Sequence, residues 1–446
     1  MLSFRKLTLI SLSLFCFTTI YSYPDVENLT SPTDATDNDF TVIPYNYAQV
    51  TQQSAQDIKT LLRRLRFVSD PNRKMQLISQ FFQNKPYATS GAEGEGDWCN
   101  ATQRDCVHIQ QDPIYRTDTV NCFTLMQTVL ALFHTTNLKQ YNQNILAIAY
   151  GAANQPASNT IHYYNRNNFV SGDFNPINER QNKITDITSF GPFAAFIQYT
   201  IATIDRENWF AFQEKAGVIG NNVRVINAVD GPAMYERFVN SYPEAAHPFI
   251  PVPTPISYIP KEVLATPITE KNGQIDYAPN ETLINQIPVP TIVEIVRDAS
   301  KWNINGVNIK DIIGTELNIS HVGLLYRQTF KPNDIIYQNT ICSLDNNDNK
   351  VCTVAPVICL NKNGCTETMF LDATSAYPSG YYYYQSPANS NHYVCTATPA
   401  PPGVPSTTCN RVMALPLGDY LTTYQYGSYI FMTSPSIVGI HVEKIN

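Results

Sequence analysis

Charged residues are scarce in this sequence, and basic residues do not outnumber acidic ones. Only 15% of the 446 residues are charged. There are 37 acidic and 30 basic side chains, which gives a formal net charge of −7. Binding to nucleic acid relies on clustered Lys and Arg that neutralise phosphates. The charge balance therefore argues against nucleic acid as a partner.

Long apolar runs are also missing, except at the N-terminus. Arg5 and Lys6 precede an apolar run from Leu7 to Ile20, and small or polar residues follow as far as Ser22. A positive segment, an apolar segment too short to cross a bilayer and a plausible cleavage site are typical of a secretory signal peptide. We therefore expect a signal peptide over residues 1–22, a single exported domain with insertions over residues 23–446, and no membrane-spanning helix.

The cysteines include no Cys-x-x-Cys pair, and no histidine stands at ligand spacing from them, so neither a zinc site nor any other cofactor is expected. Ten cysteines are present, and Cys16 leaves with the signal peptide, so nine remain. In an oxidising compartment the simplest reading is four local disulfides and one free thiol, Cys122. The expected pairs are Cys99–Cys106, Cys342–Cys352, Cys359–Cys365 and Cys395–Cys409. The last three define a disulfide-rich part at about residues 338–410.

Helical and strand patterns are mixed along the chain, which indicates an α+β protein. Apolar residues recur at helical spacing from Asp57 to Gln83, with Pro71 forcing a break. A second helix is expected from Cys122 to His134, buried because it is apolar nearly all round. Residues 191–246 are expected to be helical, and His247–Pro267 extended. Short runs rich in Ile, Val and Leu are expected to be strands: Ile292–Val296, Ile319–Tyr326 and Val438–Val442.

Cys122 begins the expected buried helix, and that position suits a nucleophile. A helix N-terminus carries roughly half a positive charge, which stabilises a thiolate and lowers the pKa of the thiol. Its backbone N–H groups can also hold a developing oxyanion. The alternative is a cysteine that packs as a small apolar residue. A free thiol in an exported chain is unfavourable unless it has a function. We therefore favour the assignment of Cys122 as a nucleophile over a packing role.

A thiolate nucleophile needs a base that also protonates the leaving amine. Of the seven histidines, His321 stands inside a short expected strand. Gly323, two residues on and on the same face, leaves room beside the imidazole for another backbone or a ligand. The other histidines lie in loops, at a helix end or in proline-rich and cysteine-rich stretches, where a surface or structural role is more common.

Asn121-Cys122-Phe123-Thr124 and Ser320-His321-Val322-Gly323 resemble the cysteine helix and the histidine strand of the N-acetylmuramoyl-L-alanine amidase-like family. This family is a specialised branch of the NlpC-type cell-wall hydrolases. Looser matches follow in the same order and extend the resemblance to roughly residues 75–446. They are Lys85-Pro86-Tyr87, Gly94-Glu95-Gly96, Tyr164 to Phe174, Asp186-Ile187-Thr188, Tyr258 to Lys261 and Gly439 to Val442.

The resemblance implies a papain-like fold, in which the cysteine helix packs on an antiparallel sheet that carries the histidine and a third polar residue. It implies hydrolysis of the amide between N-acetylmuramic acid and L-alanine, with peptidoglycan fragments (muropeptides) as the partners. Carried over, Cys122 is the nucleophile, His321 the general base and Asp372 the third residue, where relatives commonly have a histidine. The residues expected to bind substrate are Tyr87, Glu95, Arg166 and Asn168.

Two other functions fit the same residues. One is an NlpC-type endopeptidase that cuts within the stem peptide, and the other is a non-catalytic, disulfide-rich protein that binds the cell wall. Asn318-Ile319-Ser320 is a glycosylation sequon beside His321, where a glycan would obstruct the site. A bacterial protein, periplasmic or secreted, therefore fits better than a eukaryotic one.

Overall fold

The described part of the chain combines helices with antiparallel sheets, which confirms the α+β class. A computed structural model describes residues 47–87, 115–151, 166–206, 208–209, 251–271, 274–304, 306–344, 350–373, 382–385, 393–396, 399–422 and 430–446. The expected signal peptide, Glu95 and the expected Cys99–Cys106 pair lie outside these ranges.

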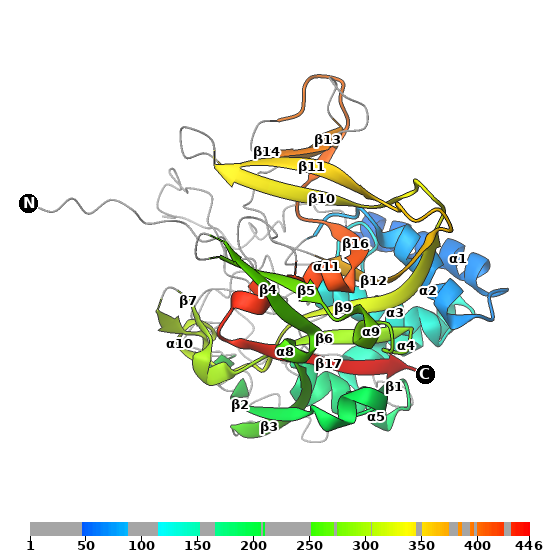
Figure 1. Cartoon of the computed structure of the whole chain (residues 1–446). Helices are drawn as coiled ribbons and strands as arrows, with labels where there is room; N and C mark the ends of the chain where they lie inside the picture. Colours follow the sequence, from blue (N-terminus) through cyan, green and yellow to red (C-terminus); the bar gives the residue numbers. More distant parts are fainter. Residues whose placement is uncertain are drawn as a thin grey trace, which may run out of the picture.

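An eight-stranded sheet organises the fold (Figure 1). The strand order is β16-β12-β9-β6-β17-β3-β2, and β1 pairs with β17 off this path. The strands are β1 (Ile184–Asp186), β2 (Gln198–Ile204), β3 (Val252–Pro260), β6 (Thr291–Arg297), β9 (Ile319–Phe330), β12 (Cys365–Ala373), β16 (Val412–Pro416) and β17 (Ile437–Ile445). The strands expected around residues 292, 319 and 438 are confirmed as β6, β9 and β17.

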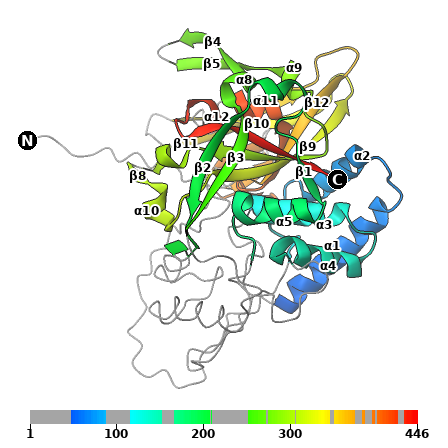
Figure 2. The ribbon, with the colours of Figure 1, turned by 90° about the horizontal axis from the view of Figure 1, so that it is seen from below.

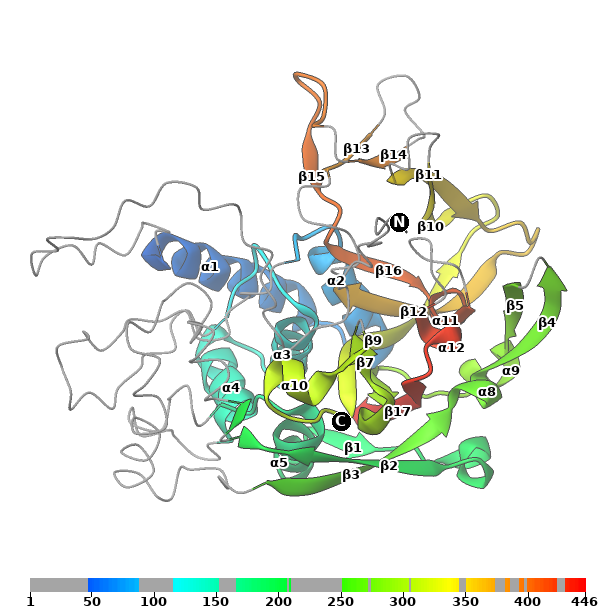
Figure 3. The same cartoon turned by 90° about the vertical axis from the view of Figure 1, so that its left-hand side faces the viewer.

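Helices cover one face of this sheet, as Figures 2 and 3 show from two directions. They are α1 (Tyr47–Leu65), α2 (Pro71–Phe82), α3 (Cys122–Phe133), α4 (Leu138–Tyr150) and α5 (Asn175–Arg180). Pro71 separates α1 from α2 as expected, because Asp70 caps α2 and the proline occupies its first turn. No helix within the described ranges is long and apolar enough to cross a bilayer.

A hairpin and short helices cover the opposite face. They are β4 (Ala265–Lys271), β5 (Gln274–Pro279), α8 (Lys261–Leu264), α9 (Glu281–Ile284), α11 (Leu417–Thr422) and α12 (Ile430–Thr433). Side chains alternate along each strand, so the two faces have separate cores. In β9, Val322 and Leu324 belong to the core that contains α3, whereas Leu325 belongs to the core that contains Leu417 and Leu421 of α11.

A second sheet of five strands forms most of the cysteine-rich part, and it lies above the main sheet in Figure 1. Its order is β10-β11-β14-β13-β15. The strands are β10 (Ile335–Leu344), β11 (Lys350–Ile358), β13 (Tyr382–Gln385), β14 (Tyr393–Thr396) and β15 (Ser406–Thr408). The smaller elements elsewhere are the π-helix Val170–Phe174, the 3₁₀ helices Gly191–Ala195 and Ala299–Lys301, β7 (Asn303–Ile304), β8 (Val307–Asn308) and α10 (Ile309–Ile313).

The expectation of helix over residues 191–246 is wrong for most of the described part of this range. A short 3₁₀ turn is followed by β2, which pairs along its whole length with β3, and helix is present only at Arg206, Asn208 and Trp209. β-Branched residues recur through β2, at Thr200, Ile201, Thr203 and Ile204, and they favour a strand because their χ1 freedom is restricted in a helix. Residues 210–250 lie outside the described ranges.

Candidate active site

The helix α3 begins at Cys122 because Asn121 caps it. The Oδ1 atom of Asn121 accepts a hydrogen bond from the backbone N–H of Thr124 at 2.8 Å, and Oγ1 of Thr124 accepts one from the backbone N–H of Asn121 at 3.0 Å. This reciprocal capping box satisfies two donors that a helix start otherwise leaves unpaired. Every residue from Cys122 to Leu132 is buried, which confirms the expectation for a helix that is apolar nearly all round.

Tyr87 lies beside the start of α3. It forms a parallel bridge with Val120, whose backbone N–H donates to the Pro86 carbonyl at 3.1 Å. On the other side, the Tyr87 N–H donates to the Asn410 carbonyl at 2.9 Å. The structure therefore holds Tyr87 next to the segment that leads into Cys122. Its predicted contact with substrate stays a prediction.

Cys122 takes part in a disulfide bond in this structure. None of the cysteines whose side chains are described is free, so the prediction of a free thiol at Cys122 is wrong. That prediction paired each cysteine with its nearest neighbour in the sequence. A disulfide requires only that the two Cα atoms lie about 4.4–6.8 Å apart in the folded chain, whatever their separation in sequence.

The other cysteines follow the expected scheme in part. Cys359 and Cys365 form a disulfide with a Cα–Cα distance of 5.7 Å, which confirms that pair. The register of β10 and β11 sets Cys342 opposite Cys352, and Cys409 is disulfide-bonded. The pairs Cys342–Cys352 and Cys395–Cys409 remain predictions.

His321 and Asp372 are brought together by neighbouring strands. The Nε2 atom of His321 in β9 is hydrogen-bonded to Oδ1 of Asp372 in β12. In this antiparallel pair Phe370 lies opposite Leu325, so alternation sets His321, Leu325, Phe370 and Asp372 on the same face of the sheet. The side chains of the pair are 19% and 6% exposed. They are partly shielded but can still be reached from solvent.

Tyr420 of α11 packs against this pair, a neighbour that was not expected from the sequence. Its ring stacks on the imidazole of His321 with centroids 6.4 Å apart, and it lies 4.6 Å from the ring of Phe370. Burial, together with the negative charge of Asp372, raises the pKa of Tyr420 well above its ordinary value, so the phenol stays neutral. Nothing in the local sequence distinguishes Tyr420, because only the packing of α11 brings it to β9.

Gly323 leaves room for a neighbouring backbone, as one of the two expected alternatives, and that backbone is β12. A Cβ atom on Gly323 would lie 2.3 Å from the ring of Phe370 and 2.8 Å from the carbonyl oxygen of Leu371. The glycine therefore permits the close approach of β12. That approach brings Asp372 within reach of His321.

Arg166 and Asn168 lie in the segment that precedes the π-helix. Arg166 is only 2% exposed, and its Nη2 donates to Oε1 of Gln127 in α3 at 3.0 Å. Its guanidinium also lies 5.8 Å from the ring centroid of Tyr150 in α4, so Arg166 links two helices. Asn168 is half-buried. The role of both residues in binding substrate stays a prediction.

Comparison with known proteins gives a family match. The model of the family described as AmiA-like, N-acetylmuramoyl-L-alanine amidase-like, matches residues 77–358. The matched range contains both the cysteine motif and the histidine motif, which confirms the resemblance found in the sequence. No curated protein matches the chain.

Two solved structures are similar to this chain. One is a protein from Legionella pneumophila str. Philadelphia 1 assigned to the family model DUF1460. It is 21% identical, the match covers 90% of this chain and 97% of that one, and the TM-score is 0.54. The other is a putative xylanase from Bacteroides fragilis. It is 14% identical, the match covers 82% of this chain and 99% of that one, and the TM-score is 0.39. The first likeness shows a shared fold.

Proposed function

Because this chain belongs to the N-acetylmuramoyl-L-alanine amidase-like family, we propose that it is an exported bacterial cysteine amidase with a papain-like, NlpC-type fold. Its substrate is the amide bond between N-acetylmuramic acid and L-alanine in muropeptides. The observation that carries the proposal is the family match over residues 77–358. The pairing of His321 with Asp372 supports it, because an imidazole oriented by a polar partner is the base that a cysteine hydrolase needs.

The proposed reaction starts with reduction of the disulfide at Cys122. A dithiol reductant supplies two electrons and two protons and becomes a disulfide itself, while Cys122 and its partner become thiols. The proton of the Cys122 thiol then passes to His321. The positive end of α3 stabilises the thiolate that remains. The helix that begins at Cys122 packs against β9, the strand that carries His321, but it does so on the face of the sheet opposite to the imidazole. The transfer therefore requires the thiol and the imidazole to meet around the end of β9.

The thiolate next attacks the carbonyl carbon of the muramic lactyl group. As the C–N bond breaks, the imidazolium of His321 gives its proton to the nitrogen of L-alanine, which leaves with the stem peptide. His321 then takes a proton from water, whose oxygen attacks the thioester and breaks the C–S bond. Because Asp372 holds Nε2, these transfers use Nδ1, and the carboxylate stabilises the imidazolium.

A non-catalytic wall-binding protein is the second candidate, and the disulfide at Cys122 favours it. A cysteine used only to hold the fold would stay oxidised during function. The endopeptidase alternative differs from the amidase only in the bond that is cut.

Mass spectrometry of defined muropeptides after incubation with the mature protein separates these functions. With a dithiol reductant, we expect an intact stem peptide that begins with L-alanine, together with free muramic sugar. The Cys122→Ser variant under the same conditions is the control and should release neither. Peptides cut internally would establish the endopeptidase instead. If reduced, folded protein leaves every substrate intact, the amidase proposal is wrong.

A further inference from the structure

Four ionisable side chains from three strands meet on the helix-covered face of the main sheet. In the pairing of β17 with β6, His441 lies opposite Glu294, and in the pairing of β1 with β17, Asp186 lies opposite Glu443. His441 and Glu443 are two residues apart on β17 and share a face. His321 and Asp372 occupy the other face of the sheet, so this cluster is separate from that pair.

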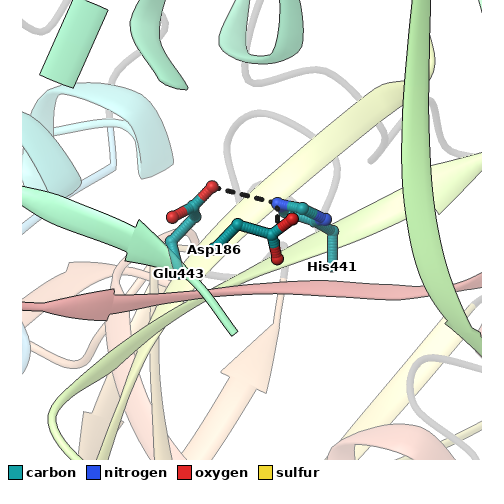
Figure 4. Close-up of side chains that lie close together, drawn as sticks. All are labelled: Asp186, His441 and Glu443. Atoms are coloured by element: carbon teal, nitrogen blue, oxygen red, sulfur yellow. Dashed lines mark hydrogen bonds and ion pairs between the residues drawn. The ribbon is translucent and has the colours of Figure 1, made fainter. Parts of the chain in front are cut away.

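Three of these side chains point toward one another (Figure 4). The Nε2 atom of His441 lies 3.0 Å from Oε1 of Glu443 and 3.9 Å from Oδ1 of Asp186, and one ligand atom from each residue lies within 4.8 Å of the others. Zinc bonds of about 2.0–2.2 Å in a tetrahedral site separate ligand atoms by about 3.4 Å. The distance from Nε2 of His441 to Glu443 is shorter than this value and the distance to Asp186 is longer, so small side-chain adjustments would admit an ion.

The imidazole of His441 is held as a metal-binding histidine requires. Its Nδ1 lies 2.9 Å from the carbonyl oxygen of Ser257, which can only accept, so Nδ1 carries a proton and donates it. Oγ1 of Thr188 lies at the same distance from Nδ1. This tautomer turns the lone pair of Nε2 toward the carboxylates. A backbone carbonyl on the far ring nitrogen commonly fixes histidines that bind metals.

Two buried carboxylate oxygens in the cluster have no hydrogen-bond donor. They are Oε1 of Glu294 and Oε2 of Glu443, neither of which has a donor in the described part of the chain, and both residues are 0% exposed. The carboxyl group of Glu179 also lies within hydrogen-bonding reach of Glu443, and two carboxyl groups this close need a proton or a cation between them. The other oxygen of Glu294 accepts from Nδ2 of Asn175 at 3.1 Å. Leaving a buried oxygen without a partner is unfavourable, so the arrangement indicates a missing proton or cation. A bound divalent cation would give these two unpaired carboxylate oxygens a partner inside the protein.

We propose that Asp186, His441 and Glu443 form a binding site for a zinc-type divalent transition-metal ion, with Glu294 beside it. One imidazole nitrogen with carboxylate oxygens suits zinc, whereas calcium and magnesium prefer oxygen alone. The side chain of Asp186 is 41% exposed and gives the ion a route of entry. The ion would join β1, β17 and, through Glu294, β6. Local ligand spacing in the sequence does not reveal this site, because Asp186 is distant in the chain from His441 and Glu443.

Isothermal titration calorimetry of the mature protein tests the proposal. The protein is first stripped with a chelator and kept without reductant, so that no thiol competes for metal. We expect one zinc ion per chain and no binding of magnesium. Asp186→Asn and Glu443→Gln should each weaken zinc binding by at least about tenfold. Asp186 is partly exposed, so its variant should fold even if the Glu443 variant does not.

Asp419→Asn is the matched control, because Asp419 belongs to a different group of acidic residues, together with Glu281 and Glu367. Its zinc affinity should equal that of the wild type. A thermal melt gives a second readout, in which zinc raises the melting temperature of the wild type and not that of Asp186→Asn. Two results would overturn the proposal. One is no zinc uptake by the wild type, and the other is an unchanged affinity in both ligand variants.

Discussion

Asp372 occupies the third position of the proposed site, where the family resemblance leads us to expect a histidine. Asp372→Asn keeps the shape of the side chain but offers His321 an amide that can donate a hydrogen bond, which favours the wrong imidazole tautomer. By analogy with serine triads, we expect turnover to fall by up to about four orders of magnitude. Asp372→His should be tolerated better.

The measurement for this prediction is muropeptide turnover by reduced protein, with folding checked by a thermal melt. His321→Ala serves as the inactive reference, because it removes the proposed proton carrier. Turnover near the wild-type rate in Asp372→Asn would mean that the third catalytic position lies elsewhere.

The disulfide between Cys359 and Cys365 closes a short loop between β11 and β12. In the chain-entropy model a loop of this length stabilises the fold by about 2 kcal/mol. We therefore expect the double variant Cys359→Ala, Cys365→Ala to lose about that much free energy of unfolding in a urea titration. Replacing both cysteines avoids a leftover thiol that could exchange with other disulfides. A loss near zero would show that the loop is held by its packing alone.

At the scale of elements, the cap of α3 can be compared with that of α4. Asn121 and Asn137 both accept a hydrogen bond from the backbone N–H three residues on, but Asn121 is buried whereas Asn137 is exposed. Loss of a cap typically costs about 1 kcal/mol, and more where the orphaned N–H has no access to water. Urea unfolding should show a larger loss for Asn121→Ala, about 2 kcal/mol, than for Asn137→Ala, about 1 kcal/mol. Equal losses would contradict the role given to burial.

Three elements each contribute a carboxyl group to one acidic cluster: Glu281 of α9, Glu367 of β12 and Asp419 of α11. Burial raises the pKa of all three, and their mutual repulsion adds to the shift for Glu281 and Glu367. The folded chain therefore holds protons that the unfolded chain releases. The three carboxyl groups contribute fully to stability at pH values below their ordinary pKa values of 3.8 and 4.5. This contribution is lost as the pH rises through their raised pKa values in the folded chain.

Asp419→Asn removes one of these titrating groups and relieves the repulsion on the other two. Its melting temperature should consequently fall less than that of the wild type as the pH is raised from about 4 toward neutrality. Thermal melts across that range, at constant ionic strength, give the comparison. The other buried carboxyl groups are present in both proteins. Parallel curves of melting temperature against pH would therefore show that the acidic cluster around Asp419 is not the cause.

At the scale of the whole molecule, the oxidation state of the cysteines can be read by chemical labelling. In denatured, non-reduced protein, iodoacetamide should label none of Cys122, Cys359, Cys365 and Cys409, because all four are disulfide-bonded. After reduction, all four should be labelled. Peptide mapping by mass spectrometry checks this, and a label on Cys122 before reduction would contradict the structure.

Features that depend on local periodicity could be predicted from the sequence. The helix at Cys122, the strand at His321 and the break at Pro71 follow from apolar spacing or backbone chemistry within a few residues. The contact between His321 and Asp372 was also anticipated, but through resemblance to a family and not through spacing.

Features that depend on tertiary packing could not be predicted in this way. The bonding of Cys122, the stacking of Tyr420 on His321 and the meeting of Asp186 with His441 all join segments that are distant in the chain. The error over β2 has a related cause, since its strand is fixed by pairing with β3 and its β-branched residues give only a weak local signal.

The position of β17 has a consequence for the order in which the chain can fold. This strand lies between β6 and β3 in the main sheet and also pairs with β1, yet it is synthesised after all three. As the chain emerges from a ribosome or a translocation channel, β3 and β6 each present an open hydrogen-bonding edge until residues 437–445 arrive. The centre of the sheet therefore closes late, and a nascent chain that stalls before β17 is a candidate for aggregation or for capture by a chaperone.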